Sequence, residues 1–373
     1  MVKAVVNPWE VKGKVDYDKL IKEFGLKPLK NLPPVLQKFV LFRRNLIFAH
    51  RDFDKILNCI KTKKPFIMLT GLMPSGKFHF GHKMVADQII FYQKLGAKVY
   101  LAVADIEAYN ARHKDMKEIR KTAISEYLVN YVALGLDLKK ADVYFQSKRS
   151  KDGKKANAYY TLANMLARHA TFNEFKALYG DITPGKMTSA LVQASDILHP
   201  QLPEFEGALP LIVPVGADQD VHLRLTRDLS QRIKEHKFVQ VSSTYNKFLP
   251  ALKGEKMSSS DPTSFIALND SSEEAAKKIK KYAFSGGQAT IEEHRKKGGN
   301  PDIDVAFQML RFGMEEDDAK LEKIRKEYKS GKLLTGELKN ILIEKMSSFL
   351  KEHHKKRKQA EKVVQKFVKD NGF

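Results

Sequence analysis

The sequence is poor in several kinds of residue, and each shortage excludes a class of protein. A single cysteine, Cys59, leaves no partner for an internal disulfide and excludes a cysteine-rich zinc site. No run of about 18 apolar residues is present, so we expect no membrane-spanning helix. The first residues also lack the charged and then apolar pattern of a signal peptide. We therefore expect a cytoplasmic protein that does not engage a membrane.

Acidic residues are also scarce relative to basic ones. The chain of 373 residues has 66 Lys and Arg against 44 Asp and Glu, which gives a formal net charge of +22. Basic side chains that neutralise phosphates release condensed counterions, so this excess favours a polyanionic partner such as a nucleic acid. The alternative is the lysine-rich surface of a heat-adapted protein, although such surfaces usually raise glutamate together with lysine.

Apolar runs predict the strands. "PFIMLTG" (65–71) has the pattern of a buried parallel strand, and "KVYLAVAD" (98–105) has that of a second. "LPLIVPVG" (209–216) predicts a further strand, whose Pro210 and Pro214 favour its ends or a sheet edge. Helical patterns follow the first strand and occupy 114–134, 157–180, 222–233 and most of the chain from about 273. This order predicts an α/β domain with a helical insert, followed by a helical domain.

Two histidines lie three residues apart just after the first predicted strand, in "PSGKFHFGHKM" (74–84). Gly71 and Gly81 permit tight backbone geometry where the strand gives way to a helix. Exposed N–H groups at a helix start, helped by the helix dipole, bind phosphate well. His79 and His82 are one turn apart, so both can face the same anion. The alternative is that they are two satisfied histidines at a helix cap.

A second candidate phosphate loop lies far downstream, in "GEKMSSSDP" (254–262). One lysine and three hydroxyls can clamp a polyphosphate, although the same loop taken alone could be phosphorylated or merely solvated. Neither stretch matches a Walker loop or a dinucleotide fingerprint. Two cationic phosphate-gripping loops belong together at the mouth of one sheet.

These two stretches resemble a known family. "HFGH" and "KMSSS" are similar to the signature pair of class I aminoacyl-tRNA synthetases, and "GADQD" (216–220) is similar to their ribose-binding turn. Residues 190–200, 214–229 and 284–307 resemble tryptophanyl-tRNA synthetases of the archaeal–eukaryotic kind, and the similarity covers nearly the whole chain. The resemblance implies a tryptophan–tRNA ligase. Such an enzyme activates L-tryptophan with ATP to tryptophanyl-adenylate and pyrophosphate, and then transfers tryptophan to the 3′ end of tRNA(Trp).

The resemblance also implies a division of the chain. Residues 1–50 would be an N-terminal extension, and 51–265 a Rossmann-like catalytic domain with a parallel sheet and a helical insertion at about 111–185. Residues 266–373 would form an α-helical anticodon-binding domain, whose last helix could return to the catalytic domain. Family members are homodimers, and the insert would form the interface. The N-terminal hairpin around Pro8 and Trp9 would be either a lid over the substrate or a plain structural strand.

Residues that match the family's motifs have implied roles. His79, His82 and Lys256 would be catalytic, because they contact the phosphates while pyrophosphate leaves. Asp218 would accept hydrogen bonds from the ribose hydroxyls. The residues implied to bind ATP are Gly71, Ser75, Gly81, Gly216, Asp218, Lys256, Met257, Ser258 and Ser259. ATP is a substrate that carries Mg²⁺; the sequence shows no protein cage for a metal ion, and we assign no metal site.

The amino acid pocket is implied to contain Leu69, Glu107, Gln193, Asp196 and Gln219. Asp196 resembles the aspartate of bacterial tryptophan enzymes that accepts the indole N–H. The alternative for both Asp196 and Glu107 is a plain structural role, as a surface polar group or a helix cap. Tyrosyl enzymes also carry an aspartate at that place, but they usually add a tyrosine where this chain has Leu69. At Leu69 the phenol hydroxyl of a tyrosine substrate would lack one polar contact. A site discriminates strongly against a ligand whose polar group stays unpaired, so Leu69 favours tryptophan.

Arg295, Lys296 and Lys297 are candidates for contacts with the anticodon region of tRNA.

Other readings of the sequence remain open. A tyrosyl-tRNA synthetase is the nearest rival. A small-molecule nucleotidylyltransferase also uses an H-x-G-H site but would not need the long helical C-terminal part. A non-catalytic RNA-binding relative would tend to lose one signature, and both are intact here.

Overall fold

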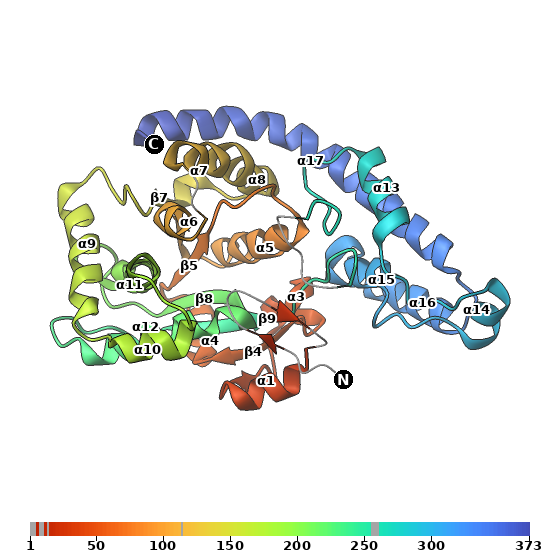
Figure 1. Cartoon of the computed structure of the whole chain (residues 1–373), viewed down its shortest axis with the longest axis horizontal. Helices are drawn as coiled ribbons and strands as arrows, with labels where there is room; N and C mark the ends of the chain where they lie inside the picture. Colours follow the sequence, from red (N-terminus) through yellow and green to blue (C-terminus); the bar gives the residue numbers. More distant parts are fainter. Residues whose placement is uncertain (1–4, 7–10, 13–14, 113–114, 255–260) are drawn as a thin grey trace.

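The structure is a computed structural model that describes residues 5–6, 11–12, 15–112, 115–254 and 261–373. At its centre is a seven-stranded sheet in which five neighbouring strands are parallel (Figure 1). Across the sheet these are β9 (Ser242–Asn246), β8 (Leu211–Gly216), β5 (Ile67–Leu72), β6 (Lys98–Val103) and β7 (Ala141–Phe145). The strand order reverses between β5 and β8, because β6 and β7 continue on one side and β9 on the other. This is the Rossmann-like α/β fold that the sequence predicts.

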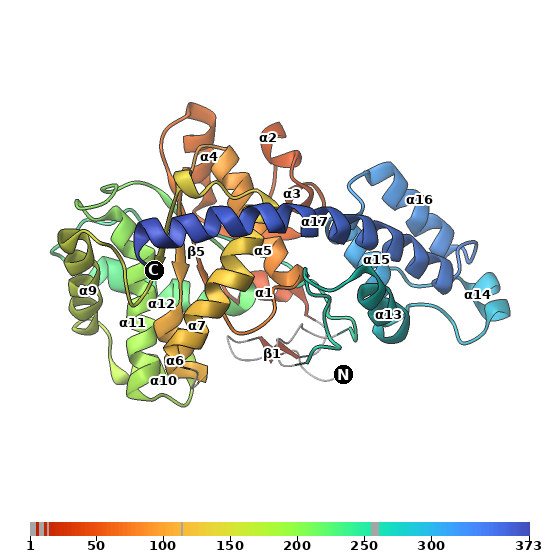
Figure 2. The ribbon, with the colours of Figure 1, turned by 90° about the horizontal axis from the view of Figure 1, so that it is seen from above.

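Helices cover both faces of the sheet and extend beyond one edge (Figure 2). One face is packed by α1 (Tyr17–Glu23), α9 (Gly153–Ala167), α10 (Phe172–Tyr179), α11 (Pro184–Leu198) and α12 (Asp220–Arg232). The core of the other face includes residues of α2 (Pro34–Gln37), α3 (Val40–Arg43), α4 (Phe53–Thr62), α5 (Phe80–Lys94), η1 (Ala123–Leu128), α8 (Val129–Leu134), α13 (Ser272–Tyr282), α15 (Val305–Met309), η5 (Leu310–Met314), α16 (Asp318–Lys329) and α17 (Thr335–Asn371). The remaining helices are α6 (Asp105–Arg112), α7 (Met116–Thr122), α14 (Ile291–Lys297), η2 (Leu138–Lys140), η3 (His199–Gln201) and η4 (Ala217–Gln219).

Side chains of the central strands alternate between the two cores. In β6, Val99, Leu101 and Val103 point into one core, while Tyr100 and Ala102 point into the other. A strand that is buried on both faces needs apolar residues at successive positions. This explains why the sequence of β6 is a continuous apolar run rather than an alternation of apolar and polar residues.

Of the two positions expected for Pro210 and Pro214, the ends of the strand or a sheet edge, the structure excludes the edge. β8 lies between β5 and β9, although Pro210 does come directly before its first residue. β8 pairs with β5 only at Leu211 and Ile212, and beyond Ile212 it pairs with β9 alone. Pro214 is tolerated because the strand has a partner on only one side at that point.

The N-terminal part belongs to the sheet more than the sequence suggests. β4 (Ile47–Arg51) pairs antiparallel with β9, and β3 (Lys27–Pro28) pairs with β4. A boundary at residue 50 would therefore cut a strand of the sheet. Before them, β1 (Val5–Val6) and β2 (Val11–Lys12) form an antiparallel hairpin, whose Pro8 and Trp9 lie outside the described residues.

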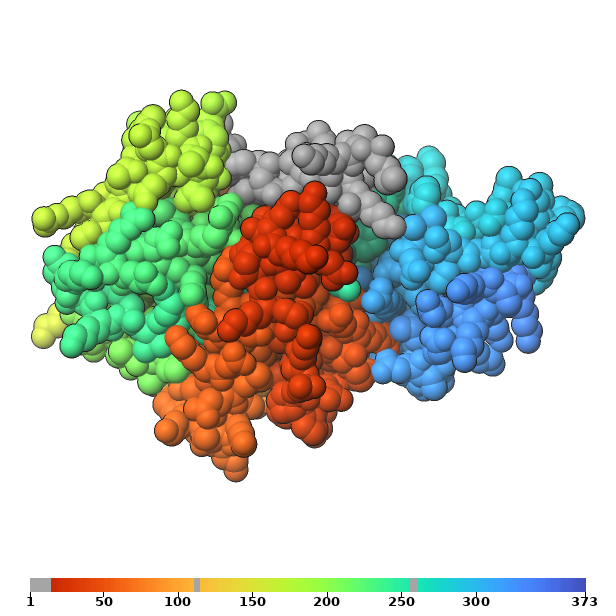
Figure 3. Space-filling view, turned by 90° about the horizontal axis from the view of Figure 1, so that it is seen from below, coloured from red at the N-terminus to blue at the C-terminus, as the bar shows by residue number. Residues whose placement is uncertain are grey.

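The N-terminal segment also contacts the C-terminal helices. Figure 3 shows the N-terminal residues, in red and orange, between the green part of the molecule and the blue C-terminal helices. The guanidinium groups of Arg43 and Arg44 each pair with the carboxylate of Asp318 in α16, at 2.7 Å. Each arginine donates its Nε–H to a different carboxylate oxygen, so Asp318 ties two neighbouring residues of the N-terminal segment to α16.

Helix α17 joins the two ends of the molecule. It runs from the C-terminal helices across α7 and α8 (Figures 1 and 2). His353 of α17 hydrogen-bonds with the side chain of Asn130 at 2.7 Å, and the Phe373 ring lies 5.0 Å from that of Phe145 at the end of β7. Although α17 is long, no helix among the described residues is apolar enough to cross a membrane.

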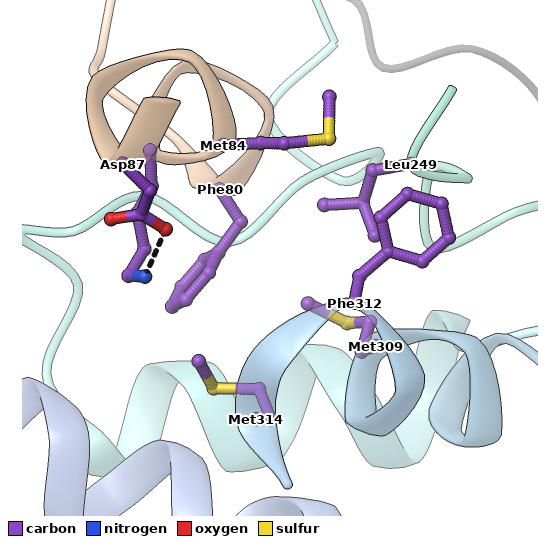
Figure 4. A pocket seen from close by; sticks show the side chains of 8 residues that line it. Phe80, Met84, Asp87, Leu249, Met309, Phe312 and Met314 are labelled. Carbon is purple, nitrogen blue, oxygen red and sulfur yellow. Dashed lines mark hydrogen bonds and ion pairs between the residues drawn. The ribbon is translucent and has the colours of Figure 1, made fainter. Parts of the chain in front are cut away.

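The contact between α5 and the C-terminal helices combines apolar side chains with the ion pair of Lys83 and Asp87 on α5 (Figure 4). A cavity of about 20 Å³ remains there, lined by Phe80 and Met84 from α5 and by Met309 and Met314 from the C-terminal side. Phe80 also packs on Phe349 of α17, with ring centroids 5.4 Å apart. Methionine fills such irregular gaps because its side chain is unbranched and flexible. The first turn of α5 is thus supported by the C-terminal helices.

Candidate active site

A cavity of about 680 Å³ opens at the carboxyl ends of β5 and β8. These strands pair only at Ile67–Leu211 and Met68–Ile212, and then diverge. Ligands of doubly wound sheets bind at this point, where the strand order reverses. Residues singled out by the sequence line the cavity: Leu69, Gly71, Glu107, Gln193, Asp196, Gly216 and Gln219.

The first turn of α5 orients both histidines through its own backbone. His79 is the N-cap residue, and its Nδ1 accepts a hydrogen bond from the N–H of Gly81 at 3.1 Å. The Nδ1 of His82 accepts from the main-chain N–H of His79 at 3.2 Å. Because each Nδ1 is an acceptor, each neutral imidazole carries its proton on Nε2. The Nε2 atom of each ring is therefore a donor rather than an acceptor, and neither histidine is among the residues that line the cavity.

Both histidines are neutral in this environment. Burial lowers the pKa of His79 to about 4. Burial, with a smaller contribution from His79, holds the pKa of His82 well below its usual 6.5. The expected cationic character of this loop is therefore wrong for its histidines, because charging an imidazole here costs desolvation energy. The positive potential at this place comes from the start of the helix instead.

The segment after the second signature contacts the first. Lys256, Met257, Ser258 and Ser259 lie outside the described residues. Farther along, Ala267 forms an antiparallel bridge with His79. The ring of Phe265 also lies 5.0 Å from the His79 imidazole. The chain following 254–262 thus packs on the start of α5.

Gly216 ends β8 beside the carboxylate of Asp218. A methyl group on Gly216 would lie 2.5 Å from Oδ1 of Asp218 and 3.1 Å from the ring of Phe248. Asp218 is only 7% exposed and accepts a hydrogen bond from the side chain of Gln219 at 3.2 Å. The glycine therefore leaves the space that this carboxylate occupies.

Asp196 is a buried carboxylate held by three donors. The hydroxyls of Tyr144 and Tyr159 both donate to its Oδ1 at 2.8 Å, and Nε2 of Gln146 donates to its Oδ2 at 2.7 Å. Burial raises the pKa of Asp196 to about 6, while hydrogen bonds from Gln146, Tyr159 and Tyr144 oppose this rise. The carboxylate borders the cavity, so it can also accept a hydrogen bond from a ligand.

A buried arginine lies behind this cluster. Arg149 pairs with Asp142 at 2.8 Å and donates through Nε to Nε2 of His199 at 2.7 Å. Its guanidinium also lies over the ring of Tyr144, 4.1 Å from the centroid. The positive charge of Arg149 lowers the pKa of Asp196 and so favours the ionised carboxylate.

The other polar residues expected in the amino acid pocket are less enclosed. Glu107, Gln193 and Gln219 line the cavity and are half-buried rather than buried. Ser75 and Gly81 are also half-buried, in the β5–α5 loop and the first turn of α5.

The three residues expected to contact tRNA lie on α14, at the tip of the C-terminal part (Figure 1). Nη1 of Arg295 donates to the main-chain carbonyl of Gly331 at 3.0 Å and also to that of Lys332. Lys297 pairs with Glu293 at 3.0 Å, whereas the side chain of Lys296 is exposed. Arg295 thus braces a neighbouring loop, although this residue is exposed like Lys296 and Lys297.

Tyr144, Gln146 and Tyr159 are functional candidates that sequence analysis missed. Tyr144 and Gln146 lie at the carboxyl end of a parallel strand, where site residues of this fold gather, so their position was a usable signal. Tyr159 lies in a helical stretch that reads simply as apolar. Nothing in the sequence indicates that its hydroxyl meets Asp196, which is 37 positions away.

Comparisons with known proteins agree with this geometry. Residues 61–351 match the family described as tRNA synthetases class I (W and Y). The tryptophan–tRNA ligases of Hyperthermus butylicus and Aeropyrum pernix are each 42% identical to this chain, over 99% of both sequences. The crystal structure of the tryptophanyl-tRNA synthetase of Aeropyrum pernix K1 covers 94% of this chain and 95% of its own, with a TM-score of 0.89 and 43% identity. That of Plasmodium falciparum also covers 94% and 95%, with a TM-score of 0.82 and 28% identity.

These relatives match over nearly their whole length and are tryptophan enzymes, which sets aside the tyrosyl, nucleotidylyltransferase and non-catalytic alternatives. The fold, the cavity at the strand reversal and the full-length similarity point to one conclusion. The chain belongs to the tryptophanyl-tRNA synthetases, class I enzymes that ligate tryptophan to tRNA.

Proposed function

We propose that this chain activates tryptophan with ATP in the cavity between β5 and β8, before transfer to tRNA. One observation carries the proposal: every residue expected to hold tryptophan lines this cavity, together with Gly71 and Gly216, which are expected to hold ATP. In the first step the tryptophan carboxylate attacks the α-phosphorus and pyrophosphate leaves. The carboxylate is already a nucleophile, so catalysis depends on positioning and on stabilising charge at the phosphorus.

On the ATP side, His79 and His82 donate their Nε2–H groups to phosphate oxygens. Both are neutral at physiological pH, so they stabilise developing charge as dipoles and need no change of protonation. Gly71, Ser75 and Gly81 accommodate the nucleotide at the start of α5. Gly216 and Asp218 hold the ribose, whose hydroxyls donate to the Asp218 carboxylate. Lys256, Met257, Ser258 and Ser259 would follow the departing pyrophosphate.

On the tryptophan side, Asp196 accepts the indole N–H. The apolar side chain of Leu69, which is 2% exposed, lines the same cavity and offers no polar partner that a phenol hydroxyl would need. Glu107, Gln193 and Gln219 are half-buried acceptors around the cavity, and they suit the ammonium end of the amino acid.

ATP enters the reaction with Mg²⁺. Among the described residues, no three His, Cys, Asp or Glu side chains group as a metal cage. We propose that the ATP phosphates carry the metal ion. When bound, Mg²⁺ neutralises part of the phosphate charge. The contribution of the chain itself is the pair of imidazole donors at the start of α5.

For the second step we propose tRNA(Trp) as partner, contacted in its anticodon region by the α14 lysines. The net charge of +22 supports a polyanionic partner. We also propose a cytoplasmic homodimer that pairs through the insert of residues 111–185. Two large side chains there, Tyr160 (36% exposed) and Phe172 (60% exposed), support an interface.

The test is amino-acid-dependent exchange between ATP and pyrophosphate, with tryptophan and tyrosine assayed in parallel. We expect exchange with tryptophan alone, and an Asp196→Asn variant should raise the KM for tryptophan without changing that for ATP. Exchange with tyrosine would contradict the argument from Leu69. A normal tryptophan KM in Asp196→Asn would contradict the assignment of the indole acceptor.

A further inference from the structure

Gln146 follows β7 directly and lines the cavity, and its side-chain amide is held in one orientation. Its Oε1 accepts a hydrogen bond from the main-chain N–H of Glu107 at 3.2 Å, and its Nε2 donates to Oδ2 of Asp196 at 2.7 Å. A main-chain N–H can only donate and an ionised carboxylate can only accept. The oxygen must therefore face Glu107 and the nitrogen must face Asp196. The residue is 1% exposed, so water cannot easily replace either bond.

Asp196 has capacity for one further hydrogen bond. An ionised carboxylate offers about four acceptor positions, two on each oxygen. Tyr144 and Tyr159 fill both positions on Oδ1, and Gln146 fills one on Oδ2. The open position is on Oδ2, the oxygen that Gln146 holds. The indole N–H of tryptophan is a single donor without an acceptor, and it needs one such position.

We propose that Gln146 is a positioning residue for tryptophan selection, which keeps Asp196 ionised and its one open acceptor position available to the indole N–H. The proposal rests on the assignment of Asp196 as indole acceptor, and it extends that assignment to a residue outside the set implied by the family resemblance. Gln146 also connects Asp196 to the backbone of Glu107. One side-chain amide therefore links the residue proposed to bind the indole with a residue proposed to bind the ammonium group.

The groups around Asp196 determine how its charge responds to pH. Burial raises the pKa of Asp196 to about 6, and the donors Gln146, Tyr159 and Tyr144 and the charge of Arg149 oppose this rise. Arg149 is itself paired with Asp142. Burial and the charge of Arg149 keep the pKa of His199 well below 6.5, so this imidazole contributes no second positive charge. Removing the Gln146 donor therefore moves the pKa of Asp196 toward neutral pH.

The first test is Gln146→Met, which keeps the length of the side chain and removes the donor. The KM for tryptophan in pyrophosphate exchange should rise roughly tenfold at pH 7, equivalent to about 1.4 kcal/mol. The increase should be largest near pH 6 and shrink toward pH 8.5, because the deprotonated carboxylate recovers at high pH. The KM for ATP should not change.

Gln201→Met is the matched control. Gln201 is also buried, at 3% exposed, and also makes two amide hydrogen bonds, both with the backbone of Val239. It does not border the cavity. Its loss should lower stability without moving the pH profile of the tryptophan KM. If Gln146→Met shows the wild-type pH profile, or a pH-independent change like that of Gln201→Met, the proposal is wrong.

A second variant keeps the test decisive if Gln146→Met folds poorly. In Gln146→Glu the new carboxyl would share a proton with Asp196 at low pH and so restore a donor, whereas at high pH the two like charges repel. The tryptophan KM should therefore rise with pH, opposite to the trend in Gln146→Met. The same trend in both variants would overturn the proposal. A normal KM in Asp196→Asn would instead show that the indole acceptor itself is misassigned.

Discussion

The imidazole rings of His79 and His82 are stacked at the first turn of α5, with centroids 3.9 Å apart and planes at 28°. Two protonated imidazoles could not remain at this separation, because like charges repel strongly in a buried site. The main-chain N–H groups of His79 and Gly81 fix both tautomers by donating to the Nδ1 atoms. The helix start therefore works as a preorganised pair of neutral N–H donors.

We expect His82→Ala to lower the rate of tryptophan-dependent pyrophosphate exchange by about 10²–10³, the usual effect of losing one preorganised donor. Burial lowers the pKa of His79 to about 4 and that of His82 well below 6.5. Protonation of this pair should therefore not cause an inflection in the wild-type rate near pH 6.5. The control His236→Ala, outside the cavity, should leave the rate unchanged. An inflection near pH 6.5 that disappears in both His79→Ala and His82→Ala would contradict the neutral pair.

Gly216→Ala should weaken ATP binding. The new methyl group would lie 2.5 Å from Oδ1 of Asp218, so the carboxylate must move away from the ribose position. We expect the KM for ATP to rise roughly tenfold, equivalent to about 1.4 kcal/mol, with little change in that for tryptophan. Gly336→Ala is the matched control, because a methyl group there meets no neighbouring atom within 4 Å. The same KM for ATP in the two variants would show that the close approach of Gly216 to Asp218 is not needed for ATP binding.

Arg149→Met should destabilise the protein by about 1–3 kcal/mol, the typical cost of leaving a buried hydrogen-bond acceptor, here Nε2 of His199, without its donor. The side chain of Arg149 is 2% exposed, and its loss leaves Asp142 without its guanidinium and Tyr144 without the cation over its ring. Urea unfolding monitored by circular dichroism measures the difference. In Arg325→Met the lost ion pair with Glu322 is on the surface, so a change of about 0–1 kcal/mol is expected. Comparable losses of unfolding free energy in both variants would argue against a special role for the buried guanidinium of Arg149.

Acid should destabilise the fold through its buried histidines. Burial lowers the pKa values of His79, His222 and His353 to about 4, so between pH 6.5 and 4 the unfolded chain binds more protons than the folded one. Stability therefore falls as pH decreases through this window. Asp196 acts in the opposite direction, because its raised pKa of about 6 makes the folded state bind the extra proton.

Urea midpoints at pH 7 and pH 5 measure this balance. We expect the wild type to lose stability at pH 5 and His353→Gln to lose less, since glutamine can still bond with Asn130 but does not titrate. An unchanged difference between the two pH values in this variant would exclude His353 as a contributor.

The α14 cations should separate into two kinds. Lys296 is exposed, so Lys296→Ala should reduce the salt dependence of tRNA binding by about one unit of slope and leave stability unchanged. Arg295 donates to the carbonyl of Gly331, so Arg295→Ala should mainly lower the midpoint temperature of thermal unfolding. Filter binding between 50 and 300 mM salt, at about ten concentrations, tests the first expectation. No change of slope in Lys296→Ala would remove this residue from the interface.

Local patterns were sufficient to predict much of the fold. The apolar run of 98–103 predicts a strand buried on both sides, and the glycine-rich turn with two histidines indicates a strand-to-helix transition; the structure has both. The placement of β8 was not predictable in the same way. Pro214 favours an end of the strand or a sheet edge, and the sequence does not show that β5 and β8 part after Ile212. Because the two strands diverge, Pro214 has no partner in β5, and the cavity opens between the strand ends.

By itself the sequence determined which residues can carry the chemistry, because motifs such as "HFGH" and the runs around Asp196 specify atom types within a few positions of each other. Only the tertiary structure decided the state of those atoms. Whether an imidazole is charged depends on its burial, and whether a carboxylate is ionised depends on donors that come from β7, the residue after it and α9. These contacts join residues up to 52 positions apart. Such distances lie beyond any local pattern. The place of Tyr144 and Gln146 at a strand end was a usable signal, but only the folded chain shows that both contact Asp196 together with Tyr159.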